Sequence, residues 1–184
     1  MKYDPNIHHR RSIRLKDYDY SQSGAYFVTI VTYNRSHLFG EIVNGMMKVN
    51  DTGFVAQIEW KKLSFRFSGI SIDNFVVMPD HMHAIIVLVG AKPEKTHSSD
   101  SPSFASPVQV DEKPHPLGTI ISSYKSTVAR LINGLRHTPG APVWLRNYYE
   151  HIIRSEKEFE NIRSYIEDNP RRWGEDLVNH ASTA

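Results

Sequence analysis

The chain has 184 residues, of which 40% are hydrophobic and 23% charged, and this composition is typical of one soluble globular domain. It contains no cysteine, which excludes a disulfide scaffold, a thiolate nucleophile and a zinc site built on sulfur. The sequence has no signal-peptide pattern and no apolar run long enough to span a bilayer, so we expect a cytoplasmic protein without a membrane partner.

The formal net charge of +2 says little about partners, but the local charge distribution says more. Residues 1–23 form a basic arm ahead of the first predicted strand. Residues 113–149 contain basic residues but no Asp or Glu. Such one-sided basic stretches suit a phosphate backbone, although each could instead be a solvated face. The predicted nucleic-acid contacts are Arg10, Arg11, Arg14, Lys125 and Arg130.

The chain after the arm begins with a predicted buried strand, residues 25–32, because this run is β-branched and aromatic. Asn44-Gly45 predicts a hairpin between residues 41–43 and 46–49. Asn50 or Asp51 can then cap a helix that runs to about residue 63.

Two neighbouring strands are predicted in the middle of the chain. Residues 70–78 and 81–89 are apolar runs interrupted by Pro79-Asp80, so they would lie antiparallel and side by side. Residues 90–116 are rich in Pro, Ser and Lys and have no periodicity, which predicts a flexible insertion within the domain.

Two helices and one strand are predicted in the last third. Apolar residues three and four positions apart form one stripe over residues 117–135. Residues 148–153 are typical of a short strand. Residues 155–158, SEKE, form a capping box, so we expect a last helix that starts there and ends at Asn169, before Pro170.

This order of elements predicts an α+β fold. The order strand, helix, strand, strand, helix, strand, helix contains two split βαβ halves, which predict a ferredoxin-like (RRM-like) antiparallel sheet with helices packed on one face. Residues 24–184 are therefore expected to form a single domain, interrupted by the flexible insertion at about 90–116.

The triplet His81-Met82-His83 is the strongest chemical signal in the sequence. Side chains at positions i and i+2 of a strand point to the same face, so both imidazoles would project together while Met82 faces the core. Such a pair can hold a metal ion whose other coordination positions stay open. The alternative is two histidines at a solvent-exposed strand end.

The last helix can complement this pair. Tyr165 and Asn169 are four residues apart and share a helix face, so the phenol could point across the sheet and the amide could offer a third metal ligand. The alternative is a half-buried tyrosine and an asparagine that helps to end the helix. Taken together, a metal that polarises a phosphate and a tyrosine that attacks it would make a covalent strand transferase.

Several segments resemble one family in the same order. Residues 76–83, VVMPDHMH, resemble the HUH motif of the single-tyrosine transposases. Residues 143–154 resemble the segment before the catalytic helix of these enzymes, and residues 165–170, YIEDNP, resemble the tyrosine motif of the REP-associated branch. The arm, at residues 10–20, is also similar to that branch.

The resemblance implies that residues 24–184 are an HUH transposase-like catalytic domain. His81 and His83 would bind Mg²⁺ or Mn²⁺, and Tyr165 would become joined to a DNA 5′ phosphate and leave a free 3′ hydroxyl. The substrate would be single-stranded DNA with hairpins, bound by a monomer or a homodimer. The insertion-sequence branch has a glutamine where this chain has Asn169, whose side chain is shorter.

Two other functions remain open on the sequence alone. A non-catalytic ferredoxin-like module could bind single strands by stacking bases on Phe27, Tyr33 and Phe75. That function leaves both histidines and Tyr165 without a role. A domesticated relative that binds hairpins but no longer moves DNA would have the same sequence features.

Overall fold

The computed structural model describes residues 22–89 and 115–181, with side chains described as far as Trp173. The predicted arm therefore lies outside the described residues, as does nearly all of the predicted insertion. The elements in chain order are β1 (Gly24–Val31), the 3₁₀ helix η1 (Tyr33–Arg35), β2 (Gly40–Val43), β3 (Met46–Val49), α1 (Asp51–Lys61), α2 (Leu63–Arg66), β4 (Ile70–Val77), β5 (His81–Leu88), α3 (Leu117–Leu135), β6 (Tyr149–Ile153) and α4 (Glu156–Ala181).

Four strands form one antiparallel sheet in the order β4-β5-β1-β6. In the ferredoxin pattern β1 is the first strand, and β5 and β6 are the third and fourth. The sheet therefore places β1 between β5 and β6, as this pattern requires. The α+β, ferredoxin-like class predicted from the sequence is confirmed. The predicted hairpin is also present as a separate two-stranded sheet, with Asn44 and Gly45 at positive φ in its turn.

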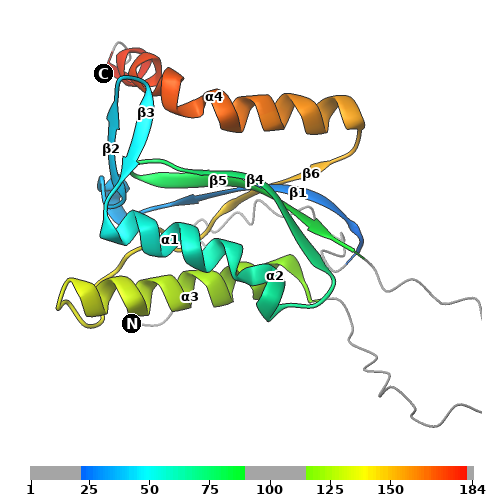
Figure 1. Cartoon of the computed structure of the whole chain (residues 1–184), viewed down its shortest axis with the longest axis horizontal. Helices are drawn as coiled ribbons and strands as arrows, with labels where there is room; N and C mark the ends of the chain where they lie inside the picture. The colour runs from blue at the N-terminus through cyan, green and yellow to red at the C-terminus, as the bar shows by residue number, and fades with distance from the viewer. Residues whose placement is uncertain (1–21, 90–114, 182–184) are drawn as a thin grey trace, which may run out of the picture.

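One face of the sheet carries the main core. Alternate residues of β1 and β5, such as Val28 and Ala84, point to this face and are fully buried. Helices α1 and α3 cover it, and Trp60 and Tyr124 pack edge to face with ring centroids 5.0 Å apart. Figure 1 shows these two helices side by side below the sheet.

Helix α4 covers the opposite face, so the expectation that the helices pack on one face is wrong for this helix. Figure 1 shows α4 on the side of the sheet away from α1 and α3, with the β2–β3 hairpin reaching its C-terminal end. The apolar residues there that are buried are only Ile85, Ile153 and Ile166, with a few half-buried neighbours. The reason is that β1, β5 and β6 are apolar on both faces, and a second apolar face needs a cover of its own.

Helix α4 does not end at Asn169 as predicted, because it continues through Pro170 to Ala181. A proline inside a helix removes one backbone hydrogen bond, a loss that tertiary contacts can offset. Here the next turn brings Trp173 against two imidazoles, with ring centroids 5.7 Å from His37 and 5.8 Å from His81. Among the described residues, no helix has the length and apolar character that a membrane span needs.

Candidate active site

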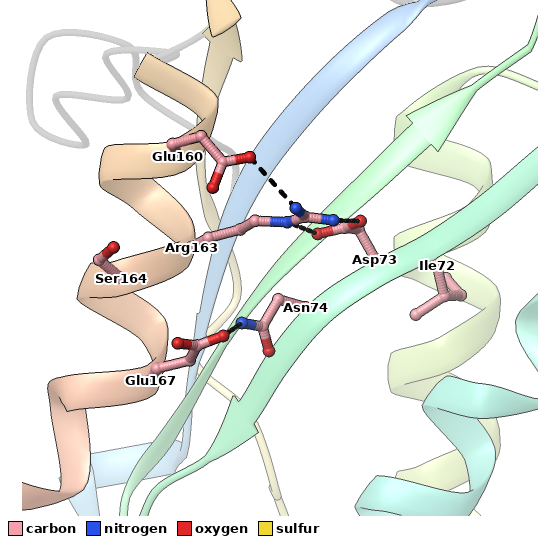
Figure 2. Close-up of a pocket in the computed structure, with 7 residues that line it drawn as sticks. All are labelled: Ile72, Asp73, Asn74, Glu160, Arg163, Ser164 and Glu167. Atoms are coloured by element: carbon pink, nitrogen blue, oxygen red, sulfur yellow. Dashed lines mark hydrogen bonds and ion pairs between the residues drawn. The ribbon is translucent and has the colours of Figure 1, made fainter. Parts of the chain in front are cut away.

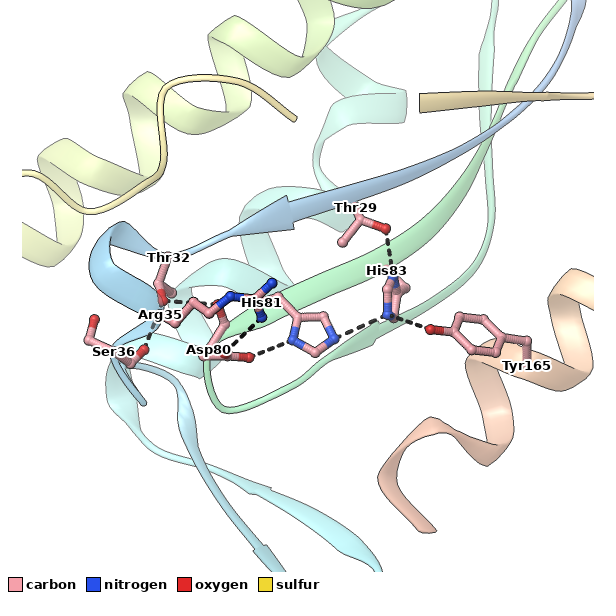
Figure 3. Close-up of polar contacts among 8 residues, drawn as sticks. All are labelled: Thr29, Thr32, Arg35, Ser36, Asp80, His81, His83 and Tyr165. Carbon is pink, nitrogen blue, oxygen red and sulfur yellow. Dashed lines mark hydrogen bonds and ion pairs between the residues drawn. The ribbon is translucent and has the colours of Figure 1, made fainter. Parts of the chain in front are cut away.

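The two histidines of β5 lie at the start of the strand and point to the face that α4 covers. Met82, between them, is fully buried in the main core on the other side. The Nε2 atoms of His81 and His83 are 3.1 Å apart, as Figure 3 shows. The strand geometry predicted from the triplet is therefore present, and both imidazoles present the same ring nitrogen to one point.

Each imidazole is held through its other nitrogen. His81 Nδ1 lies 2.5 Å from Asp80 Oδ1, and His83 Nδ1 lies 2.8 Å from Thr29 Oγ1 on the neighbouring strand β1 (Figure 3). A carboxylate can only accept, so His81 donates its Nδ1 proton to Asp80. When His83 likewise donates to Thr29, both Nε2 atoms keep free lone pairs that face each other.

Asp80 stands behind His81 as a buried carboxylate. Burial raises the pKa of Asp80, but the hydrogen bond from His81 and the charges of Arg35 and of His81 in its protonated form outweigh that effect and hold the pKa below its usual range. Thr32 donates its hydroxyl to the Asp80 backbone carbonyl at 2.9 Å, which fixes the turn between β4 and β5. The carboxylate therefore stays charged and orients the imidazole.

His83 is almost completely buried. Burial, together with a smaller contribution from the charge of a protonated His81, lowers the pKa of His83 to about 3. Its ring also stacks on Phe27 of β1, with centroids 5.3 Å apart. The imidazole is therefore neutral at physiological pH, which is the form that binds a metal ion.

Tyr165 reaches this point from α4. Its Oη lies 3.2 Å from His83 Nε2, and its ring packs edge to face on Phe27 at 6.1 Å. The residue is 40% exposed, so part of the side chain is open to solvent while the ring packs on Phe27. Three polar atoms from two elements thus converge: His81 Nε2, His83 Nε2 and Tyr165 Oη.

Asn169 lies one turn after Tyr165 and one turn before Trp173, both of which contact the histidine pair. It is buried, with 5% of its surface exposed, and within the described part of the chain its side chain makes no hydrogen bond. A buried amide without a protein partner normally bonds water or a ligand.

This donor set fits a divalent cation. Two imidazole nitrogens with free lone pairs only 3.1 Å apart repel each other unless a cation or a proton lies between them. Nitrogen and amide oxygen ligands suit Mn²⁺ better than Mg²⁺. Among the described residues, no cluster of three or more His, Cys, Asp or Glu side chains could hold a metal.

Of the five basic residues predicted to contact phosphates, the two that the structure describes do not lie at this site. Arg10, Arg11 and Arg14 lie outside the described residues. Lys125 and Arg130 lie on α3, which covers the other face of the sheet. Arg130 is exposed, whereas the Lys125 ammonium contacts three backbone carbonyls, those of Leu145 at 2.6 Å and of the next two residues at 3.1 and 3.2 Å.

Lys125 therefore holds the segment before β6, and its replacement by methionine should reveal this role. Burial lowers the pKa of Lys125 to about 8, so the three carbonyls bind a group that is partly removed from solvent. We expect Lys125→Met to lower the free energy of unfolding by about 1–2 kcal/mol. The salt dependence of hairpin binding should stay unchanged, measured beside Arg130→Gln as an exposed control. A reduced salt slope without a loss of stability would instead support a phosphate contact.

Several contributors to the site could not be found by motif. Thr29 and Phe27 reach it only because β1 pairs with β5, and Thr29 lies opposite His83 in that pairing. Trp173 follows the expected end of the helix. Asp80 had a signal, since it precedes the first histidine, but the sequence gives no reason to choose it over the carboxylates of other loops.

Comparison with known proteins places the chain in a family. No protein-family model matches it. A curated protein of Haemophilus influenzae, described as uncharacterized, is 39% identical over 179 residues, which cover 96% of this chain and 97% of that protein. The chain belongs to the same family as this Haemophilus protein.

The solved structures give the fold a name. A REP-associated tyrosine transposase bound to a REP hairpin superposes with a TM-score of 0.52 and 20% identity, covering 90% of this chain and 75% of the other. The chain has the REP-associated tyrosine transposase fold. A candidate transposase of Deinococcus radiodurans R1 is more distant, with a TM-score of 0.45, 17% identity and coverage of 84% and 97%.

Proposed function

We propose that the protein is a transposase-type strand transferase, which cleaves and rejoins single-stranded DNA through a tyrosine covalently bound to a 5′ phosphate. The observation that supports it best is the convergence of His81 Nε2, His83 Nε2 and Tyr165 Oη, each pair of neighbours within 3.2 Å. Packing alone does not explain this convergence. Two histidines in a core do not require a tyrosine hydroxyl from α4 beside them, and a packed tyrosine does not require two imidazoles.

The proposed roles are consistent with the geometry. Tyr165 Oη gives up its proton and attacks the phosphorus, so a new O–P bond joins the protein to the 5′ phosphate. The bond between phosphorus and the 3′ oxygen breaks, and this oxygen takes up a proton and leaves as a hydroxyl. His81, His83 and Asn169 would hold Mg²⁺ or Mn²⁺. The ion would polarise the phosphate and offset its developing charge. Asp80 and Thr29 keep the two imidazoles in position.

The proposed substrate is single-stranded DNA that carries a hairpin. The solved structure that shares the fold is bound to a REP hairpin, which supports this choice. We propose that Arg10, Arg11 and Arg14 contact phosphates, because they form a basic cluster in the sequence. The exposed Arg130 could add a contact only if the DNA also reaches the α3 side.

A base-stacking module without catalysis fits the arrangement of aromatic residues less well. Stacking modules of this fold use an open sheet face. Here α4 covers that face, and Phe27 is packed between His83 and Tyr165. Phe75 points to the other face and packs against the main core. Among the three aromatic residues considered for stacking, Tyr33 alone is substantially exposed, at 43%.

One experiment tests the proposal. The protein is incubated with 5′- and 3′-labelled hairpin DNA in Mg²⁺, Mn²⁺ or EDTA, and the products are separated under denaturing conditions. We expect a protein–DNA adduct that carries the 3′ label, a released strand with a free 3′ hydroxyl, and neither product in EDTA. Hairpin binding without an adduct in either metal would contradict the proposal and favour a binding module.

A further inference from the structure

Strand β4 has an irregularity that faces the catalytic helix. Its pairing with β5 shifts between Ile72, opposite Ile86, and Phe75, opposite Ala84. Two residues, Asp73 and Asn74, therefore stand opposite the single residue Ile85, which is the arrangement of a β-bulge. In a regular strand two successive side chains point to opposite faces, but the bulge lets both point to α4.

The side chains of both bulge residues form hydrogen bonds with side chains of α4 (Figure 2). Asp73 accepts two hydrogen bonds from the Arg163 guanidinium, from Nε at 2.7 Å and from Nη2 at 2.6 Å. Asn74 donates its side-chain amide to Glu167 Oε1 at 2.9 Å. Arg163 and Glu167 are four residues apart, so the bulge contacts two successive turns on one side of the helix.

These polar contacts matter because the apolar contact beneath α4 is small. Ile85, Ile153 and Ile166 are the buried apolar residues of this face, whereas the opposite core includes large side chains from five elements. Apolar burial is also non-directional, and it does not fix the rotation of a helix about its axis. Directional contacts are needed to fix that rotation.

The contacts and the nucleophile lie on opposite flanks of the helix. With 3.6 residues per turn, Ile162 and Ile166 face the sheet, Arg163 and Glu167 lie on the β4 flank, and Tyr165 lies on the flank toward the histidines. A rotation of α4 that moves Tyr165 away from His83 therefore also breaks the contacts to the bulge.

We propose that the Asp73–Asn74 bulge is a positioning device for Tyr165, an inference that rests on the proposed function. The bidentate pair of Asp73 and Arg163 sets the rotation of α4, and the bond between Asn74 and Glu167 reinforces it. Asp73 and Arg163 are positioning residues, because neither touches the reacting atoms. A nucleophile displaced by about 1 Å can lose roughly a hundredfold in rate.

The test is a double-mutant cycle of Asp73→Asn and Arg163→Gln, with Asp168→Asn as a control. Asp168 also pairs with an arginine of α4, Arg171 at 3.7 Å, but within the helix and not with the sheet. The single-turnover rate of adduct formation is measured beside hairpin affinity in EDTA. We expect both single variants to slow the rate by roughly tenfold or more, and the double variant to be no slower than either. Affinity should change less than about threefold, because phosphate contacts lie elsewhere.

The two substitutions change the net charge in opposite directions, so equal loss of rate cannot come from long-range attraction of DNA. A second readout is hydrogen exchange of the α4 amides, which should accelerate over residues 163–169 in both single variants while β1 and β5 stay protected. Wild-type rates in the single variants, or rate losses that simply add in the double variant, would overturn the inference. If even the unmodified protein forms no adduct, the proposed function fails, and unchanged exchange of α4 in the variants would then reject the positioning role separately.

Discussion

Replacing Tyr165 by phenylalanine should abolish the covalent adduct and DNA cleavage, with a fall in rate of roughly a thousandfold or more. The substitution removes the oxygen that would bond to phosphorus but keeps the ring that packs on Phe27. Tyr165 is 40% exposed and loses one hydrogen bond, to His83, so the free energy of unfolding should change by about 1 kcal/mol or less. Adduct yield, hairpin affinity and thermal unfolding are measured together.

Tyr149→Phe is the matched control for this prediction. Tyr149 is the other exposed tyrosine near the site, 45% exposed, and its ring packs edge to face on the same Phe27 at 6.3 Å. It makes no ring contact or hydrogen bond with either histidine among the described residues. We expect it to retain an adduct. An adduct from Tyr165→Phe that maps to Tyr149 by mass spectrometry would contradict the choice of nucleophile and leave the reaction class standing.

Replacing His81 or His83 by alanine should remove metal binding and DNA cleavage together. Each imidazole contributes one of the two converging Nε2 atoms, and a single imidazole cannot replace the pair. We expect Mn²⁺ affinity to fall by roughly a hundredfold or more, measured by titration calorimetry without DNA. Hairpin affinity in EDTA should be retained.

His137→Asn is the control for general effects of losing a histidine. His137 lies just after α3, away from the site, and has a positive φ that asparagine tolerates well. It should bind Mn²⁺ and cleave DNA like the unmodified protein. If His83→Ala bound Mn²⁺ as tightly as the control, the histidines would have a purely structural role. Cleavage by either alanine variant in excess EDTA would exclude metal dependence altogether.

The sequence predicted those parts of the fold and site that depend on local periodicity. The two-residue spacing of His81 and His83 required a shared face, and the fully buried Met82 between them fits that requirement. The four-residue spacing of Tyr165 and Asn169 likewise required one helix flank. Asn44-Gly45 predicted the hairpin, because both residues readily adopt the positive φ values that the turn needs.

The parts that sequence did not predict depend on contacts between distant elements. The local sequence does not indicate which face of the sheet α4 covers. It also does not indicate that α4 continues past Pro170, where Trp173 contacts His81. The sequence predicts a phosphate contact for Lys125, because the three carbonyls that it contacts belong to a later segment and leave no trace in its neighbourhood of the sequence. The same holds for the bulge, where Asp73 and Asn74 look like a polar break in a strand.

The two faces of the sheet differ in how strongly a substitution affects folding. Most buried apolar side chains lie under α1 and α3, whereas His81, His83 and Tyr165 lie on the face with the smaller core. Substitutions at these three positions thus leave the larger core under α1 and α3 untouched. Under the proposed function, a lineage that carries this domain can lose DNA cleavage in a single step and still inherit a folded protein, available for selection on other properties.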